Sequence, residues 1–456
     1  MPDRRSFLKW SAALLAGTSV SALSRRARPI EPVQAPGDAP ADSPINIDAA
    51  SRVVTPDGEA TAGRDVDGVR VYHLVAEPVQ HHVAPGLQLQ MWGFNGGIPG
   101  PTIEAVVGQR VRIYVTNRLP APTAIHWHGL EIPNGMDGVA GITQRAIGPG
   151  ETFRYEFDLP RAGTFMYHPH TDEMTQIGLG MMGAIVVYPE QPEPVDRDFV
   201  ITLSEFAVRA GRRRPDTTEM VDFDVLTING KVFPHTESLR VELGDRVRIR
   251  IINLSQMSHH PIHLHGHNFQ ITATEGGPIP STAQWPETTV LVPTGAVREI
   301  TFVADNPGDW MLHCHMLHHL MNQMGHPDPS PVGVDAESLD ETIRPLIPEF
   351  RTMGAAGMAA MHENDDVDHH QPDHDHHGEH NHEAHEMALP DNSIAMQTFP
   401  GPMGPVEMGG MATLLQVRET LPDDPDDVDW YDHPEDRIAR QATDEELERD
   451  GIDVDH

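Results

Sequence analysis

Short runs in which apolar and polar side chains alternate follow one another along the chain from Val69 to about His315. The runs are rich in β-branched residues and end at Gly, Pro, Asn or Asp, a pattern typical of half-buried β-strands joined by turns. No long stretch with helical spacing competes with them. We therefore expect an all-β fold. The clearest runs are Val69–Val75, Leu87–Phe94, Arg110–Asn117, Thr152–Asp158, Ser238–Leu243, Arg246–Asn253 and Val297–Ala304.

The two halves of the chain repeat each other, which indicates two domains of one fold. Gly108–Ile113 recurs as Gly244–Ile249, and each run continues to an asparagine. Pro189–Arg197 is rich in Pro and Glu, so we interpret it as the linker. We expect a first β-sandwich at residues 65–190 and a second at 197–335.

Four His-x-His pairs stand in matching places in the two halves. Alternate residues of a strand face the same side, so each pair points two imidazoles in one direction. As core residues, eight converging imidazoles would need eight separate hydrogen-bond partners, whereas shared metal ligation accounts for all of them. The pairs are His126 with His128, His168 with His170, His263 with His265, and His313 with His315.

Softer candidate ligands surround the last pair. The chain has one cysteine, Cys314, so no intrachain disulfide can form and the thiol needs another explanation. Cys314 lies between His313 and His315, His319 follows it by five residues, and Met324 follows by five more. Two imidazoles, a thiolate and a weak axial thioether make the blue-copper electron-transfer site.

Together these motifs resemble the signature of the multicopper oxidase family. Two segments carry this resemblance. His313–Met324 reads His-Cys-His-x₃-His-x₄-Met, and His260–His265 reads His-Pro-Ile-His-Leu-His. The match covers all four family motifs and most of Gly96–Met324. It implies two cupredoxin-like Greek-key sandwiches, as in two-domain laccase-like enzymes and copper-resistance oxidases, in place of the three domains of larger laccases.

The resemblance also implies one type 1 copper, one type 2 copper and a type 3 pair. The implied type 1 ligands are His260, Cys314, His319 and Met324, the type 2 ligands are His126 and His263, and the type 3 ligands are His128, His168, His170, His265, His313 and His315. Asp137 resembles a carboxylate that family members place beside the cluster to orient water and supply protons. A turn aspartate before a glycine is the competing interpretation.

The implied function is one-electron oxidation of a reduced substrate, either Cu(I) or a phenolic compound, coupled to four-electron reduction of dioxygen to water. The sequence leaves the physiological donor open. The alternative is a periplasmic copper-binding or resistance protein with little turnover. Copper nitrite reductase shares two such domains but needs few histidines, and the four His-x-His pairs argue against it. The linker of about nine residues reaches at most about 30 Å, so we expect each cluster to be shared between chains that close into a ring. The resemblance to two-domain enzymes implies that this ring is a homotrimer.

Residues 336–456 have a composition unlike that of the sandwiches. Nine histidines stand among Asp and Glu from His362 to His385, scattered methionines accompany them, and Met411–Val417 is a short apolar strand candidate. A copper-gathering arm and a largely irregular acidic tail both explain this composition. Every candidate cluster ligand precedes the tail, so we expect removal of the residues after about Asn364 to leave phenol oxidation largely intact but to weaken Cu(I) oxidation or copper tolerance.

The N-terminus carries an export pattern. Asp3–Lys9 contains a twin arginine, and the apolar run Trp10–Leu23 is too short for a permanent membrane span. We therefore assign residues 1–40 to a twin-arginine signal and a disordered N-terminus. With no later membrane span in the sequence, the protein is expected to be periplasmic or extracellular.

The charge excludes one class of partner. The formal net charge is −36 and the chain has only two lysines, Lys9 and Lys231. No broad basic face is available, so we expect no binding of nucleic acid. The acidity is compatible both with attraction of cations and with adaptation to salt.

Overall fold

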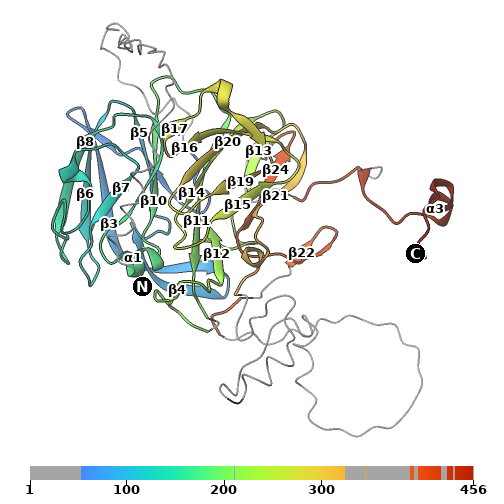
Figure 1. The fold of residues 1–456 in the computed structure, drawn as a ribbon, viewed down its shortest axis with the longest axis horizontal. Coiled ribbons are helices and arrows are strands. Elements are labelled where there is room, and N and C mark those ends of the chain that lie inside the picture. The colour runs from blue at the N-terminus through green and yellow to red at the C-terminus, as the bar shows by residue number, and fades with distance from the viewer. Residues whose placement is uncertain are drawn as a thin grey trace, which may run out of the picture. The chain divides into compact units, whose positions relative to one another are not determined.

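The computed structural model describes residues 53–209, 211–323, 345, 391–394, 399–422, 429–434 and 437–454. The chain divides into two compact units, Met1–Pro44 and Ile45–His456, and all described residues lie in the second (Figure 1). The expected export signal, Met324 and the histidine run at 362–385 lie outside the described residues.

Two sheets form the first sandwich. One has the strand order β1-β5-β10-β9-β7, and the other has the order β2-β3-β6-β8 with β4 paired to β3. Large side chains that are fully buried, among them Trp127, Phe157 and Tyr167, fill the space between the sheets. The elements are β1 (Ala60–Thr61), β2 (Arg64–Val66), β3 (Val69–Ala84), β4 (Leu87–Phe94), β5 (Thr102–Val106), β6 (Arg110–Asn117), β7 (Ile125–His128), η3 (Asn134–Met136), β8 (Thr152–Asp158), β9 (Gly163–Pro169), α1 (Glu173–Gly178) and β10 (Gly183–Tyr188).

The second sandwich also has two sheets. Their strand orders are β12-β11-β14-β20-β16-β17, with β18 paired to β16, and β13-β24-β21-β15-β19. The elements are β11 (Arg197–Phe206), β12 (Val225–Ile228), β13 (Leu239–Glu242), β14 (Arg246–Asn253), β15 (His260–Leu264), β16 (Phe269–Thr274), β17 (Gly277–Pro278), η4 (Ser281–Ala283), β18 (Trp285–Glu287), β19 (Thr289–Val292), β20 (Val297–Val303), β21 (Gly308–Cys314), η5 (Leu317–Leu320) and β24 (Ala412–Arg418). A hairpin of β22 (Phe399–Gly401) and β23 (Gly404–Val406) and a helix α3 (Asp444–Asp450) lie outside these sheets.

The expected all-β architecture is confirmed, and the periodicity explains it. In β6, burial alternates strictly, with Val111, Ile113 and Val115 facing the core. Strands β10 and β11 are instead buried almost throughout, and β10 has a near-continuous apolar sequence. A strand covered on both faces needs no polar side. The described helices are all too short or too polar to cross a membrane.

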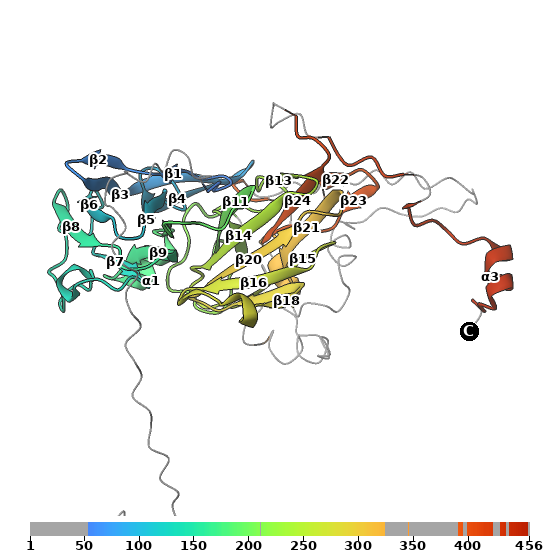
Figure 2. The ribbon, with the colours of Figure 1, turned by 90° about the horizontal axis from the view of Figure 1, so that it is seen from above.

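The two sandwiches pack face to face through those doubly buried strands. A third apolar cluster joins Met166 and Val186 of the first sandwich to Val200 and Ile252 of the second. Figures 1 and 2 show the sheet that contains β5 and β10 beside the sheet that contains β11 and β14. The two halves therefore share one continuous core.

A buried polar network crosses the same boundary. Arg250 donates to both carboxylate oxygens of Asp198 at 2.8 Å and to Glu299 at 2.8 Å. Thr164 of the first sandwich accepts from Arg250 at 2.7 Å and donates to Glu299 at 2.6 Å. Loss of one partner of a buried ion pair strongly destabilises a protein. Because Thr164 joins this network from the first sandwich, an arrangement of the two sandwiches that keeps the network intact is favoured.

Strand β24 corrects the predicted domain boundary at residue 335. It pairs in parallel with β13 and antiparallel with β21, so it is an internal strand of the second sandwich (Figure 2). Its Leu415 and Val417 are fully buried in the core. The strand candidate in the tail is therefore part of the fold, because β21 would otherwise present an unpaired edge.

We expect truncation before β24 to unfold the second sandwich, contrary to the expectation from sequence. A chain ending at Met408 lacks β24, whereas a matched chain ending at Pro422 keeps it. Leu415→Ala in the full chain should cost about 2–5 kcal/mol because it leaves a cavity in the core. The exposed Met403 provides the control substitution to Ala. Denaturant unfolding measures all four chains, and equal stability of the two truncated chains would contradict the assignment.

Candidate metal centres

A cysteine and two histidines meet inside the second sandwich; we call them the cysteine site. The Sγ atom of Cys314 lies 3.2 Å from Nδ1 of His319 and 3.7 Å from Nδ1 of His260. The two Nδ1 atoms are 3.1 Å apart. All three side chains are buried, so water has little access to this group.

Strand pairing and one tight turn bring these residues together. In the β15–β21 ladder, Ile262 is opposite Cys314, so His260, two residues earlier, faces the same side. The turn η5 folds back after β21 and carries His319 to the sulfur. Met411, just before β24, accepts a hydrogen bond from the amide of Cys314 at 3.0 Å and donates one to the carbonyl of His319 at 2.8 Å.

The chemistry of this donor set fits a soft metal ion. Burial, followed by neighbouring histidines, lowers the pKa of His260 to about 3, and the same causes lower the pKa of His319 to about 3. Both imidazoles are therefore neutral and have a lone pair to offer. Burial is the main cause that raises the pKa of the Cys314 thiol to about 12, so the thiolate requires a cation beside it. Copper, with its preference for thiolate and imidazole, meets both conditions.

A second-sphere hydroxyl orients His260. The buried Ser255 lies with its Oγ 2.6 Å from Nε2 of His260, which leaves Nδ1 directed at Cys314. Asn253 in turn accepts from the amide of Ser255 at 2.9 Å. Sequence reasoning missed Ser255, because a serine five residues before a ligand carries no signal of its own.

The first histidine set consists of His126, His128, His168 and His170. Strands β7 and β9 pair with His126 opposite His168, so the four rings gather at one end of the sheet. The ring of His126 lies 5.4 to 5.7 Å from the other three. Nδ1 of His128 is 3.2 Å from Nε2 of His168, and with His126 they form a group that can hold a metal ion.

The second histidine set consists of His263, His265, His313 and His315. Strands β15 and β21 place His263 opposite His313. The Nε2 atoms of His265 and His313 are 3.0 Å apart, and the rings of His263 and His315 lie 5.7 Å apart. The structure brings together the four histidines of each set. The two sets stay apart within the chain: among the described residues, no ring contact or hydrogen bond joins one set to the other.

Hydrogen bonds donated by Nδ1–H orient five of these rings so that Nε2 is left for a metal. These contacts come from carbonyl groups or carboxylates next to the sets. They are Asp137 O to His126 at 2.8 Å, Pro169 O to His168 at 2.9 Å, Thr288 O to His263 at 2.7 Å, Cys314 O to His313 at 2.8 Å, and Glu173 Oε1 to His170 at 2.9 Å.

Asp137 touches the first histidine set in two ways. Its carbonyl oxygen accepts from His126, and its carboxylate Oδ1 lies 3.4 Å from the same Nδ1. The following Gly138 has φ +87°, and a Cβ there would lie 1.7 Å from the carbonyl oxygen of Ile125. Both sequence interpretations thus have a basis: Asp137 is in a turn that needs glycine, and it lies beside a candidate ligand.

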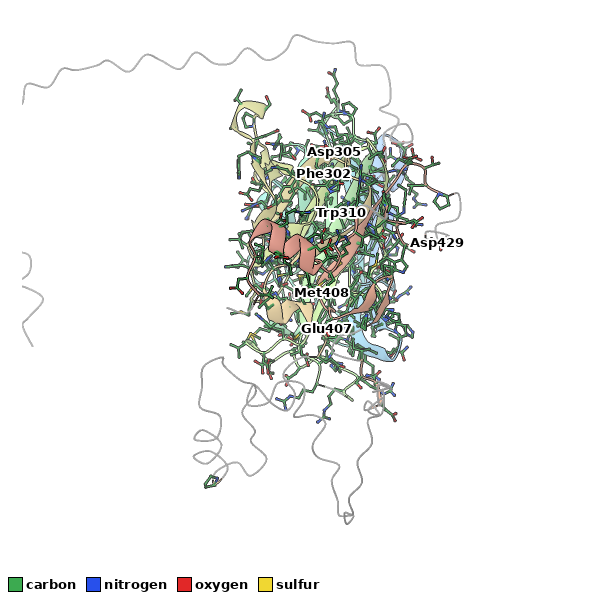
Figure 3. The ribbon with its side chains drawn as sticks, turned by 90° about the vertical axis from the view of Figure 1, so that its right-hand side faces the viewer. Phe302, Asp305, Trp310, Glu407, Met408 and Asp429 are labelled. Carbon is green, nitrogen blue, oxygen red and sulfur yellow. The ribbon has the colours of Figure 1, made fainter. Side chains whose placement is uncertain are left out.

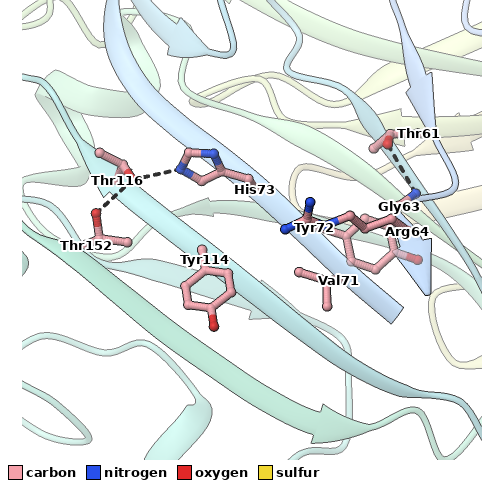
Figure 4. A pocket seen from close by; sticks show the side chains of 9 residues that line it. All are labelled: Thr61, Gly63, Arg64, Val71, Tyr72, His73, Tyr114, Thr116 and Thr152. Atoms are coloured by element: carbon pink, nitrogen blue, oxygen red, sulfur yellow. Dashed lines mark hydrogen bonds between the residues drawn. The ribbon is translucent and has the colours of Figure 1, made fainter. Parts of the chain in front are cut away.

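Two further features that contain a histidine lie outside the candidate centres. His267 is buried against Phe302 and Trp310, which Figure 3 labels, and its Nδ1 lies 3.2 Å from the carbonyl oxygen of His265. A pocket on the outer sheet of the first sandwich (Figure 4) contains none of the candidate ligands. Its His73, Thr116 and Thr152 satisfy one another by hydrogen bonds of 2.7 and 2.9 Å.

Known proteins match both halves of the chain. Two multicopper oxidase family models match residues 76–192 and 205–327. The multicopper oxidase MmcO of Mycobacterium tuberculosis is 34% identical over 218 residues, covering 41% of this chain and 43% of that protein. Copper resistance protein A of Escherichia coli is 27% identical over 241 residues, covering 42% and 40% respectively. This chain therefore spans less than half the length of these curated relatives.

Solved structures match over a larger share of their length. The blue copper oxidase of Nitrosomonas europaea is 34% identical with a TM-score of 0.52, covering 56% of this chain and 82% of that one. The multicopper oxidase mgLAC is 36% identical with a TM-score of 0.52, covering 57% and 83%.

We expect the metal-free protein to lose stability as the pH falls below 6.5, the ordinary pKa of its buried histidines. In the folded protein, burial lowers the pKa of His168 to about 4 and that of His319 to about 3. The unfolded chain then binds more protons than the folded one, so this stability is full above pH 6.5 and is lost as the pH falls through the window down to those values. Urea unfolding of chelator-treated protein between pH 6.5 and about pH 5 measures the loss.

The matched variants for this prediction are His319→Gln and His73→Gln, the second at an exposed position. His319→Gln should flatten the pH dependence, and His73→Gln should leave it unchanged. A stability that rises on acidification, or identical slopes in both variants, would refute the role of buried neutral imidazoles.

Proposed function

This chain belongs to the multicopper oxidase family, and we propose that it is an exported copper oxidase that passes single electrons from a reduced donor to dioxygen. The observation that carries the proposal is the position of one residue. Cys314 lies in the cysteine site with His260 and His319, while its chain neighbours His313 and His315 belong to the second histidine set. One strand end therefore serves two different metal environments.

The donor atoms support an assignment of four coppers. His260, Cys314 and His319 would hold the type 1 copper together with Met324, which lies outside the described residues. His126 and His263 would hold the type 2 copper. The type 3 pair would be held by His128, His168, His170, His265, His313 and His315.

The protein contributes a route for electrons, a site shielded from water and ligands in fixed orientations. Bound copper supplies one-electron transfer at the type 1 site and oxygen reduction at the three-copper group. Cys314 offers a path of a few covalent bonds from its sulfur to His313 and His315. Burial of the cysteine site excludes water, and the Nδ1 contacts hold the rings of five histidines of the two sets in one orientation. Asp137, within reach of His126, is proposed to orient water and supply protons at the cluster.

The proposed donors are Cu(I) or a phenolic compound. A thioether from Met324 would give electron density to copper and would lower its reduction potential relative to that with an apolar residue at this position. Donors that are easily oxidised therefore suit this enzyme. The twin arginine before Trp10–Leu23 supports export through the twin-arginine pathway to the periplasm or beyond.

We further propose that the active form is a homotrimer with the three-copper clusters at the subunit boundaries. Each histidine set offers only half of the ligands and is partly exposed, with His265 and His315 open to solvent. Because the sandwiches are joined by a continuous core, the two sets cannot swing together within a chain. The first set of one chain must then meet the second set of the next, and this head-to-tail contact has to close into a ring.

The alternative is a copper-binding or resistance protein with little turnover. Its support is the run of histidines from His362 to His385, which lies outside the described residues. It differs from the oxidase in one measurable respect, since it binds copper without consuming oxygen.

We expect Cys314→Ser to remove the intense visible absorption of the copper-loaded protein and its oxygen uptake with a phenolic donor. The band requires a copper–thiolate bond, and serine offers no thiolate. His73→Ala, at a histidine outside every site, is the control and should keep both signals. An intact band in the Cys314 variant would exclude the type 1 assignment, and wild-type protein that binds copper without oxygen uptake would favour the alternative.

We expect two inactive variants, His126→Ala and His313→Ala, to restore activity when they are co-expressed. In a ring, about a quarter of randomly mixed boundaries combine an intact first set with an intact second set. Co-expression of His126→Ala with His128→Ala is the matched control: both changes damage the first set, so no boundary is intact. Activity in neither mixture, together with an active monomer by light scattering, would rule out shared clusters.

A further inference from the structure

Glu205, at the end of β11, is a buried carboxylate that lies outside the set of proposed ligands. Its side chain is almost fully shielded from solvent, at 1% exposure. Glu205 pairs with Leu226 of β12. It therefore lies in one sheet of the second sandwich, and the cysteine site lies on the other sheet. Burying a carboxylate is costly, which calls for an explanation of its presence.

One oxygen of Glu205 holds the loop that leads into β15. Oε1 accepts hydrogen bonds from two consecutive amides, Met257 at 2.7 Å and Ser258 at 2.9 Å. The side chain of Gln256 donates to the backbone carbonyl of Glu205 at 3.1 Å. This loop delivers His260, two residues after Ser258, to Cys314.

The other oxygen has no compensating partner. Oε2 of Glu205 is buried and makes no hydrogen bond within the part of the chain that the structure describes. Two other buried acids, Asp198 and Glu299, are both paired with Arg250. Glu205 is thus a buried carboxylate next to a ligand-bearing loop without a cation to neutralise it in the described residues. Its charge also acts on Cys314, as a minor contribution beside burial to the raised pKa of that thiol.

We propose that Glu205 is a positioning residue of the type 1 site whose negative charge lowers the reduction potential of the copper. The proposal rests on the proposed function. Reduction of Cu(II) to Cu(I) lowers the positive charge of the site by one. A fixed negative charge nearby therefore stabilises the oxidised form more than the reduced form, and the protein interior screens this interaction less than water does. The same side chain also holds the loop that carries His260. It therefore affects both the position of this ligand and the reduction potential of the copper.

Glu205→Gln separates the two roles. The amide oxygen can still accept from Met257 and Ser258, so the loop keeps its anchor, but the charge is gone. We expect the equilibrium of the copper-loaded protein with a one-electron mediator to shift about tenfold toward the reduced form, which corresponds to about 59 mV. The Cys314-dependent visible band, followed in a redox titration, is the readout, and its position should not change.

Two further variants complete the test. Glu104→Gln makes the same change at another buried acid, in β5 of the first sandwich, and should leave the potential unchanged. Glu205→Leu removes the anchor as well, and should raise the potential and also alter the visible band. Circular dichroism verifies folding of each variant.

The outcomes are distinguishable. A visible band in the wild type with an unchanged or lower potential in Glu205→Gln would overturn the role of Glu205 and leave the proposed function standing. An equal shift in Glu104→Gln would also overturn it, since the effect would then not be local. Absence of the visible band in copper-loaded wild type would overturn the type 1 assignment and this proposal together.

Discussion

The pairing of β15 with β21 is the contact on which every candidate metal centre of the second sandwich depends. Its register sets Ile262 opposite Cys314 and His263 opposite His313. Because successive residues of a strand face opposite sides, Cys314 points into the core while its histidine neighbours point out of it. A slip of one residue would exchange these faces and dismantle the cysteine site and the second histidine set at once.

That pairing is held in place by a segment from far along the chain. Strand β24 covers the other edge of β21, and Met411 bonds to the backbone of both Cys314 and His319. Gly410 allows this close approach: it has φ +61°, and a Cβ there would lie 2.2 Å from the carbonyl oxygen of His319. The tail is therefore a structural part of the cysteine site.

The sequence predicted local and repeated features well, because strand periodicity and motif spacing are local properties. The alternation in Arg110–Asn117 and the His-x-His pairs needed no knowledge of the tertiary structure. What it missed depends on contacts between distant residues. Met411–Val417 looked like an isolated strand, because its composition does not indicate that it pairs with β13 and β21. Ser255 and Glu205 gain their roles only from the path of the loop between β14 and β15. The face-to-face packing of the sandwiches did have a local signal, because the continuous apolar sequence of β10 is typical of a strand covered on both faces. The prediction of two domains relied on the repeats and did not use this signal.

The separation of the two histidine sets links metal binding to association. Within one chain, each set holds one pair of imidazole nitrogens close together, at 3.2 Å in the first set and 3.0 Å in the second, and its rings are partly exposed. In the proposed ring, copper bound between two chains satisfies both sets at once, and a ligand that binds only the assembled form stabilises that form. Copper loading and subunit association should then be one linked equilibrium. The shared core between the sandwiches contributes to this linkage, because it holds the two sets of each chain in a fixed relation, and only a fixed relation allows a head-to-tail contact to close into a ring of defined size.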